Sequence, residues 1–205
     1  MPLPEERREH WEKVFREKAE DDVSWFQERP RTSLELIART GAGRSAKIVD
    51  VGGGASRLVD GLLEVGHRDV TVVDISEAAL ARSRARVAER VRWIVSDVLR
   101  WTPEVVFDVW HDRAVFHFMV RPEDREVYRA TMLRALARGG HAIVATFAAS
   151  GPERCSGLPV QRYEPEELAA ELGPELRLVE SLHEEHVTPA GKVQAFQFSR
   201  FRRAP

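Results

Sequence analysis

The sequence predicts a doubly wound α/β domain built on a seven-stranded, mostly parallel sheet. Two observations support this prediction. Between residues 47 and 147, short apolar runs alternate with longer amphipathic segments, which is typical of repeated strand and helix units. From residue 176 to 201, two extended runs flank a Pro-Ala-Gly turn signal, which predicts an antiparallel hairpin at the carboxyl end.

The length and charge balance are those of one globular domain. The chain has 205 residues and a net charge of -2, so it lacks the basic surplus that nucleic-acid binding requires. No apolar run approaches the roughly 20 residues that span a bilayer, and the amino terminus does not resemble a secretory signal. We therefore expect a cytoplasmic monomer or homodimer that binds neither nucleic acid nor membrane.

The first part of the chain is predicted to form a helical lid, residues 1–42, on a main domain, residues 43–205. Over residues 5–20, Trp11 and Phe15 belong to a narrow apolar stripe with helical spacing. An amphipathic helix of this kind must dock on another surface. Its aromatic side chains are expected to cover the binding edge of the sheet, and the alternative is plain hydrophobic docking of a terminal helix.

A loop and a short helix are predicted to follow. Trp25 lies in a polar stretch that stops at Pro30, which indicates a loop with aromatic anchors. Thr32 and Glu35 have the spacing of a capping box, which predicts a helix from there to about Thr40.

The main domain contains five predicted parallel strands and the hairpin. The parallel strands are expected at residues 47–51, 69–74, 92–97, 105–110 and 141–147. Helices are expected at residues 58–65, 76–90 and 122–138 and from residue 165, and the hairpin strands at residues 176–187 and 192–201. Pro122 and Pro165 are suited to the first turn of a helix, since the missing amide has no partner there.

Glycines join the first strand to its helix, and an aspartate ends the second strand. Gly52, Gly53 and Gly54 allow backbone to approach a ligand without an intervening Cβ. Asp74 follows Asp50 by 24 residues, where a carboxylate can accept both hydroxyls of a ribose. The pair indicates a nucleotide site, and the alternative is a glycine turn required only for tight packing.

Two classes of nucleotide compete for this site. A dinucleotide fingerprint requires glycine or alanine where the chain has Arg57, so a nicotinamide enzyme is the less favoured alternative. Asp50 would repel a pyrophosphate but suits a ligand that carries an ammonium and a sulfonium group. The predicted cofactor is therefore S-adenosylmethionine, with S-adenosylhomocysteine as its product.

From about residue 10 to its end, the sequence resembles the class I S-adenosylmethionine-dependent methyltransferases. Their first motif, an acid and then Gly-x-Gly-x-Gly after one residue, matches Asp50, Gly52 and Gly54, with Ser56 in place of the third glycine. The resemblance implies a Rossmann-like methyltransferase fold, a ribose-binding role for Asp74 and an adenine-binding role for Asp97. The predicted cofactor contacts are Trp11, Trp25, Asp50, Gly52, Gly53, Gly54, Ser56, Asp74, Ile75, Asp97, Val98 and His111.

The segment FDVWHDRAVFHF around the fourth strand is expected beside the transferred methyl group. Its D-R-A stretch is similar to that of the thiopurine and small-thiol methyltransferases. Methyl transfer is an in-line displacement in which positioning supplies much of the acceleration, and some acceptors also need a base. The predicted catalytic residues are His111, Asp112 and Arg113. Arg113 is also suited to an anionic substrate, and the alternative is a structural pair between Asp112 and Arg113.

The acceptor is expected to meet the long loop after the fifth strand. The predicted acceptor contacts are His117, Cys155, Arg162, Tyr163 and His186. The alternatives are a packing role for His117 and an ordinary surface loop around Cys155. His183 and His186 point to opposite faces of a strand, so no metal site is predicted.

These observations predict a methyltransferase that acts on a small-molecule thiol, carboxyl or other nucleophile. A protein-lysine methyltransferase and a non-catalytic S-adenosylmethionine-binding protein are the alternatives. A narrow pocket under the aromatic lid favours a small acceptor, whereas an open acidic groove favours lysine.

Overall fold

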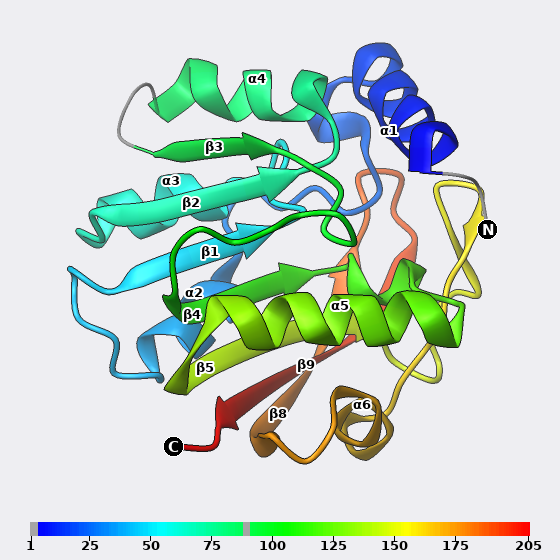
Figure 1. Cartoon of the computed structure of the whole chain (residues 1–205). Coiled ribbons are helices and arrows are strands. Elements are labelled where there is room, and N and C mark those ends of the chain that lie inside the picture. Colours follow the sequence, from blue (N-terminus) through cyan, green and yellow to red (C-terminus); the bar gives the residue numbers. More distant parts are fainter. Residues whose placement is uncertain (1–3, 88–90) are drawn as a thin grey trace.

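A seven-stranded sheet with strand order β3-β2-β1-β4-β5-β9-β8 forms the centre of the protein in the computed structural model, which describes residues 4–87 and 91–205 (Figure 1). Strands β1 to β5 are parallel, and β9 and β8 close the sheet as an antiparallel hairpin, so the predicted sheet is confirmed. The strands of this sheet are β1 (Lys47–Val51), β2 (Asp69–Asp74), β3 (Arg92–Val95), β4 (Phe107–Arg113), β5 (Leu136–Phe147), β8 (Leu176–Val187) and β9 (Val193–Arg203). A separate two-stranded ribbon consists of β6 (Arg154–Cys155) and β7 (Leu158–Pro159).

Helices cover both faces of the sheet, as the doubly wound prediction requires. Helices α5 and α6 lie in front of the sheet in Figure 1, and α2 and α3 lie behind it. The α-helices are α1 (Pro4–Glu17), α2 (Arg31–Ala38), α3 (Leu58–Glu64), α4 (Glu77–Val87), α5 (Pro122–Ala135) and α6 (Pro165–Leu172), and the short 3-10 turns are η1 (Glu20–Asp22) and η3 (Phe116–Phe118). Helix α1 and the β6–β7 ribbon both lie beyond the edge at which the parallel strands end.

Several predicted element boundaries differ from the structure. The third strand ends at Val95 and not at residue 97, and the fourth is Phe107–Arg113 and not residues 105–110. Helix α2 starts after Pro30 with no side-chain cap, and the Thr32 hydroxyl donates instead to Glu184, 2.5 Å away, so the capping-box prediction is wrong. Helix α5 ends at Ala135 and β5 starts at the next residue, because the chain pairs with β4 before the glycines on which the prediction relied. Helix α4 is described as far as Val87, and the last predicted residues, 88–90, lie outside the described residues.

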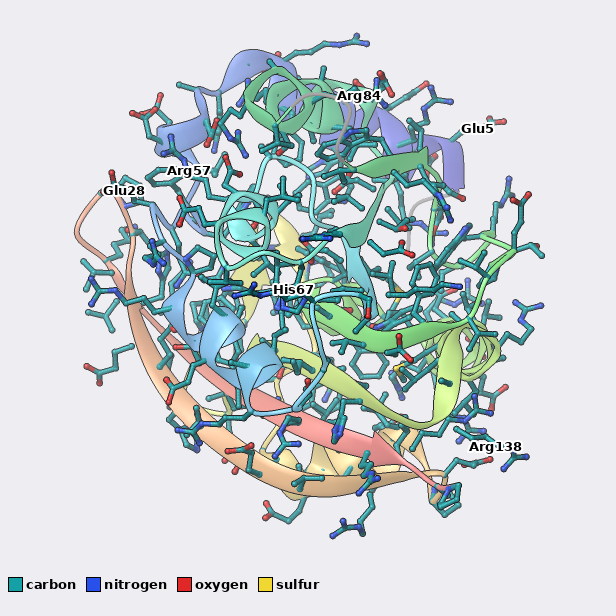
Figure 2. All side chains as sticks on the ribbon, turned by 90° about the vertical axis from the view of Figure 1, so that its left-hand side faces the viewer. Glu5, Glu28, Arg57, His67, Arg84 and Arg138 are labelled. Atoms are coloured by element: carbon teal, nitrogen blue, oxygen red, sulfur yellow. The ribbon has the colours of Figure 1, made fainter. Side chains whose placement is uncertain are left out.

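The parallel strands fill the core, and charged side chains cover the surface. Strands β1 and β2 are buried along nearly their whole length because helices cover both of their faces. Figure 2 views the molecule from the edge at which these strands begin, and charged side chains such as those of Glu5 and Arg138 lie at the periphery of this view. None of the helices within residues 4–87 and 91–205 is long and apolar enough to cross a membrane.

Candidate active site

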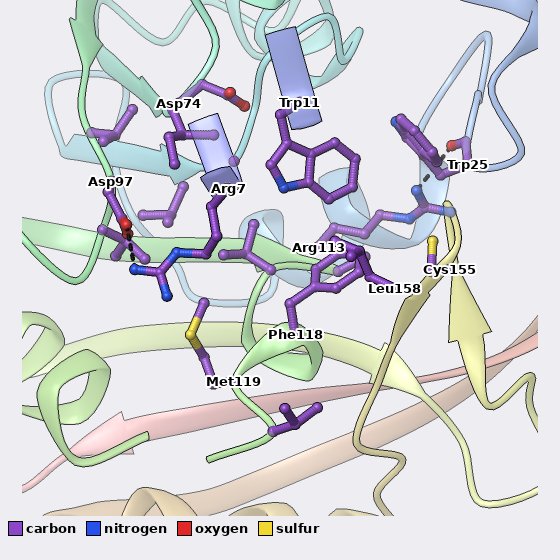
Figure 3. A pocket seen from close by; sticks show the side chains of 18 of the residues that line it. Arg7, Trp11, Trp25, Asp74, Asp97, Arg113, Phe118, Met119, Cys155 and Leu158 are labelled. Carbon is purple, nitrogen blue, oxygen red and sulfur yellow. Dashed lines mark hydrogen bonds and ion pairs between the residues drawn. The ribbon is translucent and has the colours of Figure 1, made fainter. Parts of the chain in front are cut away.

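A cavity lies at the carboxyl ends of β1, β2 and β4, beneath α1 (Figure 3). Strand order reverses here, since the chain crosses from β1 to β2 on one side and reaches β4 on the other. Ligands of open α/β sheets bind at such a reversal. The predicted cofactor residues that line the cavity are Trp11, Trp25, Gly52, Asp74, Ile75, Asp97 and Val98. The other predicted cofactor residues are not part of the lining: Asp50, Gly53, Gly54, Ser56 and His111.

The glycine loop packs too closely for a side chain at any of its three glycines, as Gly52 and Gly54 illustrate. Gly52 has φ +69°, and a Cβ there would overlap Cγ2 of Val115. Gly54 has φ +35°, and a Cβ there would lie 2.7 Å from Oδ2 of Asp74. Packing alone therefore requires both glycines, and Gly52 also borders the cavity.

Asp74 ends β2 and presents its carboxylate at the cavity. Its Oδ1 accepts a hydrogen bond from the amide of Ser76 at 2.8 Å. Burial, together with the nearby carboxylates of Asp50 and Glu12, raises the pKa of Asp74 to about 7. A ligand that donates hydrogen bonds to this carboxylate therefore favours its ionised form.

Asp97 forms an ion pair with a residue that the sequence analysis missed. Nη2 of Arg7, on α1, donates to Oδ2 of Asp97 at 2.7 Å, and both side chains are nearly buried. The other oxygen of Asp97 accepts from the amide of Leu99 at 3.0 Å. Arg7 precedes Trp11 by four residues and so lies on the same face of the helix, which is the signal that could have identified it.

Aromatic rings from α1 and the following loop cover the cavity. The ring of Trp11 lies 5.9 Å from Trp25 and 5.1 Å from Phe118, centroid to centroid, and Phe15 lies 6.0 Å from Trp25. All four residues line the cavity. Edge-to-face aromatic contacts of this kind fix the position of the terminal helix over the site.

His111 bridges the sheet and α2 behind the cavity. Its Nδ1 lies 2.7 Å from Oδ1 of Asp50, and its Nε2 lies 2.9 Å from Oγ of Ser33. The three side chains are buried. Both ring nitrogens are therefore engaged, and the predicted catalytic and cofactor roles of His111 stay predictions that this geometry does not favour.

Asp112 organises the turn after β4. Its carboxylate accepts hydrogen bonds from the amides of Val115 at 2.8 Å and Phe116 at 3.0 Å and from the hydroxyl of Tyr128 at 2.5 Å. Burial raises the pKa of Asp112 to about 6. Because the carboxylate is fully buried and does not line the cavity, these contacts describe a structural anchor rather than the predicted catalytic group.

Arg113 is the predicted catalytic residue that lines the cavity. Its Nη1 donates to the carbonyl of Trp25 at 3.0 Å, and its guanidinium lies 4.6 Å from the ring centroid of Phe196. Burial lowers its pKa to about 10, which leaves it a cation at neutral pH. Arg113 and Asp112 have separate partners, so the alternative of a structural pair is wrong. The next residue, Ala114, lines the cavity with φ +71°, a strained conformation found at functional sites.

Among the predicted acceptor contacts, Cys155 lines the cavity and His117 does not. Burial raises the pKa of the Cys155 thiol to about 11, so it is protonated at neutral pH. His117 is fully buried between Phe118 and Phe147, with ring centroids 4.4 and 4.8 Å away. Burial lowers the pKa of His117 to about 3, which supports the alternative of a neutral packing residue.

The other predicted acceptor contacts, Arg162, Tyr163 and His186, do not line the cavity. Arg162 donates to the carbonyl of Gly151 at 3.1 Å, and the ring of Tyr163 packs 5.6 Å from that of Phe116. His186 is buried, with Nε2 2.8 Å from the carbonyl oxygen of Ser24. Four side chains that the sequence analysis did not select line the cavity together with Cys155 and Arg113, and we call this part the acceptor end: Phe147, Leu158, Pro159 and Phe196.

The fold and the site together define a nucleotide-binding α/β protein with an antiparallel closing hairpin. Residues 48–140 match the family described as Methyltransferase domain. Over these residues the chain is similar to methyltransferase domains, and the solved structures that share its fold include S-adenosylmethionine-dependent methyltransferases.

Two relatives with known names match part of the chain. The chain is 29% identical over 118 residues to Nodulation protein S of Rhizobium tropici, a match that covers 57% of this chain and 49% of that protein. It is 29% identical over 147 residues to the eEF1A lysine and N-terminal methyltransferase of Danio rerio, covering 68% of this chain and 21% of that protein. The chain therefore spans half or less of the length of these relatives.

A solved structure is similar over the whole chain. The 1,6-didemethyltoxoflavin-N1-methyltransferase of Burkholderia thailandensis, solved with 1,6-didemethyltoxoflavin and S-adenosylhomocysteine, superposes with a TM-score of 0.75 at 24% identity. The match covers 100% of this chain and 92% of that one. At this identity, the similarity establishes the fold.

Proposed function

We propose that the protein transfers a methyl group from S-adenosylmethionine to a small-molecule acceptor. The observation that carries this proposal is that Gly52, Asp74 and Asp97, which follow or end three neighbouring strands, border one cavity. Homology to methyltransferases supports the reaction, and the Burkholderia relative with its small substrate supports the acceptor class.

The lining residues fit the parts of S-adenosylmethionine. When bound, this cofactor supplies a methyl carbon attached to a positively charged sulfur. The Asp74 carboxylate suits the ribose hydroxyls, and Ile75 and Val98 supply apolar surface for the adenine. The faces of Trp11 and Trp25 favour a nearby cation. Asp97 suits an amino group of the adenine, although its Oδ2 is bound to Arg7.

The lining residues would promote methyl transfer in two ways: they position the acceptor and they exclude water. In methyl transfer from a bound cofactor, the acceptor's lone pair would form the bond to the methyl carbon, and the electron pair of the broken carbon–sulfur bond would stay on sulfur. The aromatic cover from α1 restricts water, and the cavity walls hold the acceptor in line. At the acceptor end, the Cys155 thiol is protonated and Arg113 is a cation, so neither acts as a base. The proposal therefore favours acceptors whose attacking atom needs no protein base.

A lysine acceptor is less compatible with this cavity. The described residues at the acceptor end include the cation Arg113, and the carboxylates of the lining, Asp74 and Asp97, belong to the cofactor end. A cationic lysine side chain would be repelled by Arg113. The cavity also lies beneath an aromatic cover, which is the arrangement expected for a small acceptor.

Calorimetric titration with S-adenosylmethionine, S-adenosylhomocysteine and NAD tests the proposal. We expect micromolar binding of the first two ligands, no binding of NAD, and loss of binding in Asp74→Asn. Asp69→Asn is the matched control, because Asp69 lies at the opposite end of the same strand. Binding of NAD alone, or of none of the three, would overturn the proposal.

A further inference from the structure

Arg113 has hydrogen-bond donors that no described residue uses. The guanidinium donates once, from Nη1 to the carbonyl of Trp25. Its Nε and Nη2 are buried and have no hydrogen-bond partner among the described residues. These two nitrogens share one edge of the planar group, which is an edge that binds a carboxylate through two parallel hydrogen bonds.

The neighbouring carboxylate, Glu184, does not satisfy that edge. Its Oε1 lies 4.0 Å from Nη2 of Arg113, beyond hydrogen-bond distance. Gln27 donates to Oε1 at 2.8 Å, and Thr32 donates to Oε2 at 2.5 Å. Glu184 is thus held away from Arg113 by partners of its own, and it offsets only part of the positive charge.

The remaining titratable neighbours of Arg113 add no negative charge on the cavity side at neutral pH. Burial keeps the Cys155 thiol protonated, and burial together with Arg113 itself lowers the pKa of His186. The Asp50 carboxylate is engaged with His111 behind the cavity lining. A buried guanidinium with two unused donor nitrogens therefore belongs to a residue that lines the cavity (Figure 3).

The walls around this cation are apolar. Phe147 lines the cavity from β5 and Phe196 from the neighbouring β9, and Leu158 and Pro159 line it from the β6–β7 ribbon. Phe196 also packs against the face of the guanidinium. An occupant of this end thus meets one cationic edge and otherwise hydrocarbon and aromatic surface.

We propose that the methyl acceptor carries a carboxylate, which binds the Nε and Nη2 edge of Arg113, on an apolar or aromatic body that fills the space between Phe147, Leu158 and Phe196. This inference rests on the proposed methyl transfer and names the class of its acceptor. Arg113 then acts as a substrate-binding residue that orients the acceptor. The methionine carboxylate of the cofactor has the same chemistry, so the test must separate the two sources.

The test uses the full-length protein saturated with S-adenosylhomocysteine. Phenylacetate, benzoate and 4-hydroxybenzoate are titrated by calorimetry beside their neutral primary amides. We expect each acid that binds to do so at least about tenfold more tightly than its amide, because the amide lacks the charge that Arg113 pairs with. Equal affinity of acids and amides, or no binding of any of the three acids, would overturn the inference.

Three variants assign the preference to Arg113. Arg113→Met is expected to abolish the preference for acids, and Arg113→Lys to retain part of it, since lysine keeps the charge but loses the two-nitrogen edge. Arg154→Met is the control, because Arg154 is an exposed residue of the β6–β7 ribbon and does not line the cavity. Retention of the acid preference in a folded Arg113→Met protein would overturn the inference.

Two further measurements separate the possible outcomes. If Arg113→Met weakens S-adenosylhomocysteine but not 5′-methylthioadenosine, and leaves the acid preference intact, the cofactor's carboxylate is the partner of Arg113 and the inference is wrong. If the unaltered protein binds no S-adenosylmethionine, the proposed methyl transfer itself fails. Binding of the cofactor without any preference for acids would remove the acceptor inference alone.

Discussion

Nη2 of Arg7 lies 2.7 Å from Oδ2 of Asp97, and this ion pair joins the first helix to the loop after β3 across the cavity (Figure 3). One helical turn further on, Trp11 packs against Trp25 and Phe118. An ion pair and an aromatic cluster thus fix α1 over the cavity from the same helix face. We propose that α1 is the lid that the amphipathic sequence of residues 5–20 predicts.

Loss of the Arg7 guanidinium is expected to destabilise the protein. Arg7→Met leaves the nearly buried Asp97 carboxylate without its cation, which should lower the free energy of unfolding by about 1.5 to 3 kcal/mol. Arg16→Met, on the same helix, removes an exposed partner of Glu12 and should cost less than about 0.5 kcal/mol. Urea unfolding measures both values. Equal effects of the two substitutions would contradict the role of the Arg7 pair.

Substitution of Gly52 separates backbone strain from steric overlap. Gly41 and Gly52 have similar positive φ angles, +74° and +69°, but a Cβ at Gly41 meets open space and one at Gly52 overlaps Val115. We expect Gly41→Ala to cost about 1 to 2 kcal/mol and Gly52→Ala to cost a further 1 to 3 kcal/mol or so.

The double variant Gly52→Ala with Val115→Ala should recover the steric part, since Val115 supplies the overlapping atom. Thermal unfolding of these three variants and of the unaltered protein measures these differences. If Gly52→Ala is no worse than Gly41→Ala, the close approach of the loop to Val115 is wrong.

The pKa of Asp74 predicts a pH-dependent affinity for the ribose. Hydroxyl donors bind the ionised carboxylate of Asp74. Burial raises the pKa of this carboxylate to about 7. As the pH falls below 7, binding must expel a proton, so affinity should drop about tenfold for each pH unit. The probe is 5′-methylthioadenosine, which carries the ribose but no titrating amino acid. A flat profile from pH 5.5 to 8 would exclude Asp74 as the ribose-binding group.

The same burial predicts that stability falls as pH rises. Folding raises the pKa of Asp74 from 3.8 to about 7 and that of Asp112 from 3.8 to about 6. The folded protein therefore holds more protons than the unfolded chain between these values, and the stabilisation is lost as pH rises through the folded pKa values.

Urea unfolding of the ligand-free protein at pH 5 and pH 8 checks this dependence. The free energy of unfolding should decrease over this interval, and the decrease should be smaller in Asp74→Asn, which cannot ionise at that position. An equal decrease in the variant would show that other groups cause it.

His111 is expected to matter for stability. Its ring joins Asp50 and Ser33 in a buried chain, so His111→Ala leaves a buried carboxylate without a partner and should lower the free energy of unfolding by at least about 1 to 3 kcal/mol. Ser33→Ala removes only the outer contact and should cost less. A His111→Ala protein of unaltered stability that binds the cofactor but has lost turnover would instead support the catalytic role that the sequence suggested.

Local patterns determined much of the fold. Strands such as Lys47–Val51 and Asp69–Asp74 coincide with their predicted ranges. A short apolar run between turn residues fixes where a buried parallel strand begins and ends. The positions of Gly52 and Asp74 at strand ends were likewise predictable, since they follow from chain order alone. Element boundaries that depend on a distant partner were not predictable. For example, Thr32 binds Glu184 instead of capping its own helix.

The tertiary structure alone decided which polar side chains face the cavity. Asp112 and Arg113 are adjacent in the sequence, yet their side chains leave a strand on opposite faces, and one meets Tyr128 in the core while the other meets the cavity. Arg7 and Phe196 reach the site from opposite ends of the chain. The sequence by itself determined the sheet, the glycine loop and the acid that follows it, because those depend on local pattern. Packing between distant segments determined the acceptor end, because burial and hydrogen-bond partners there come from residues far apart in the chain.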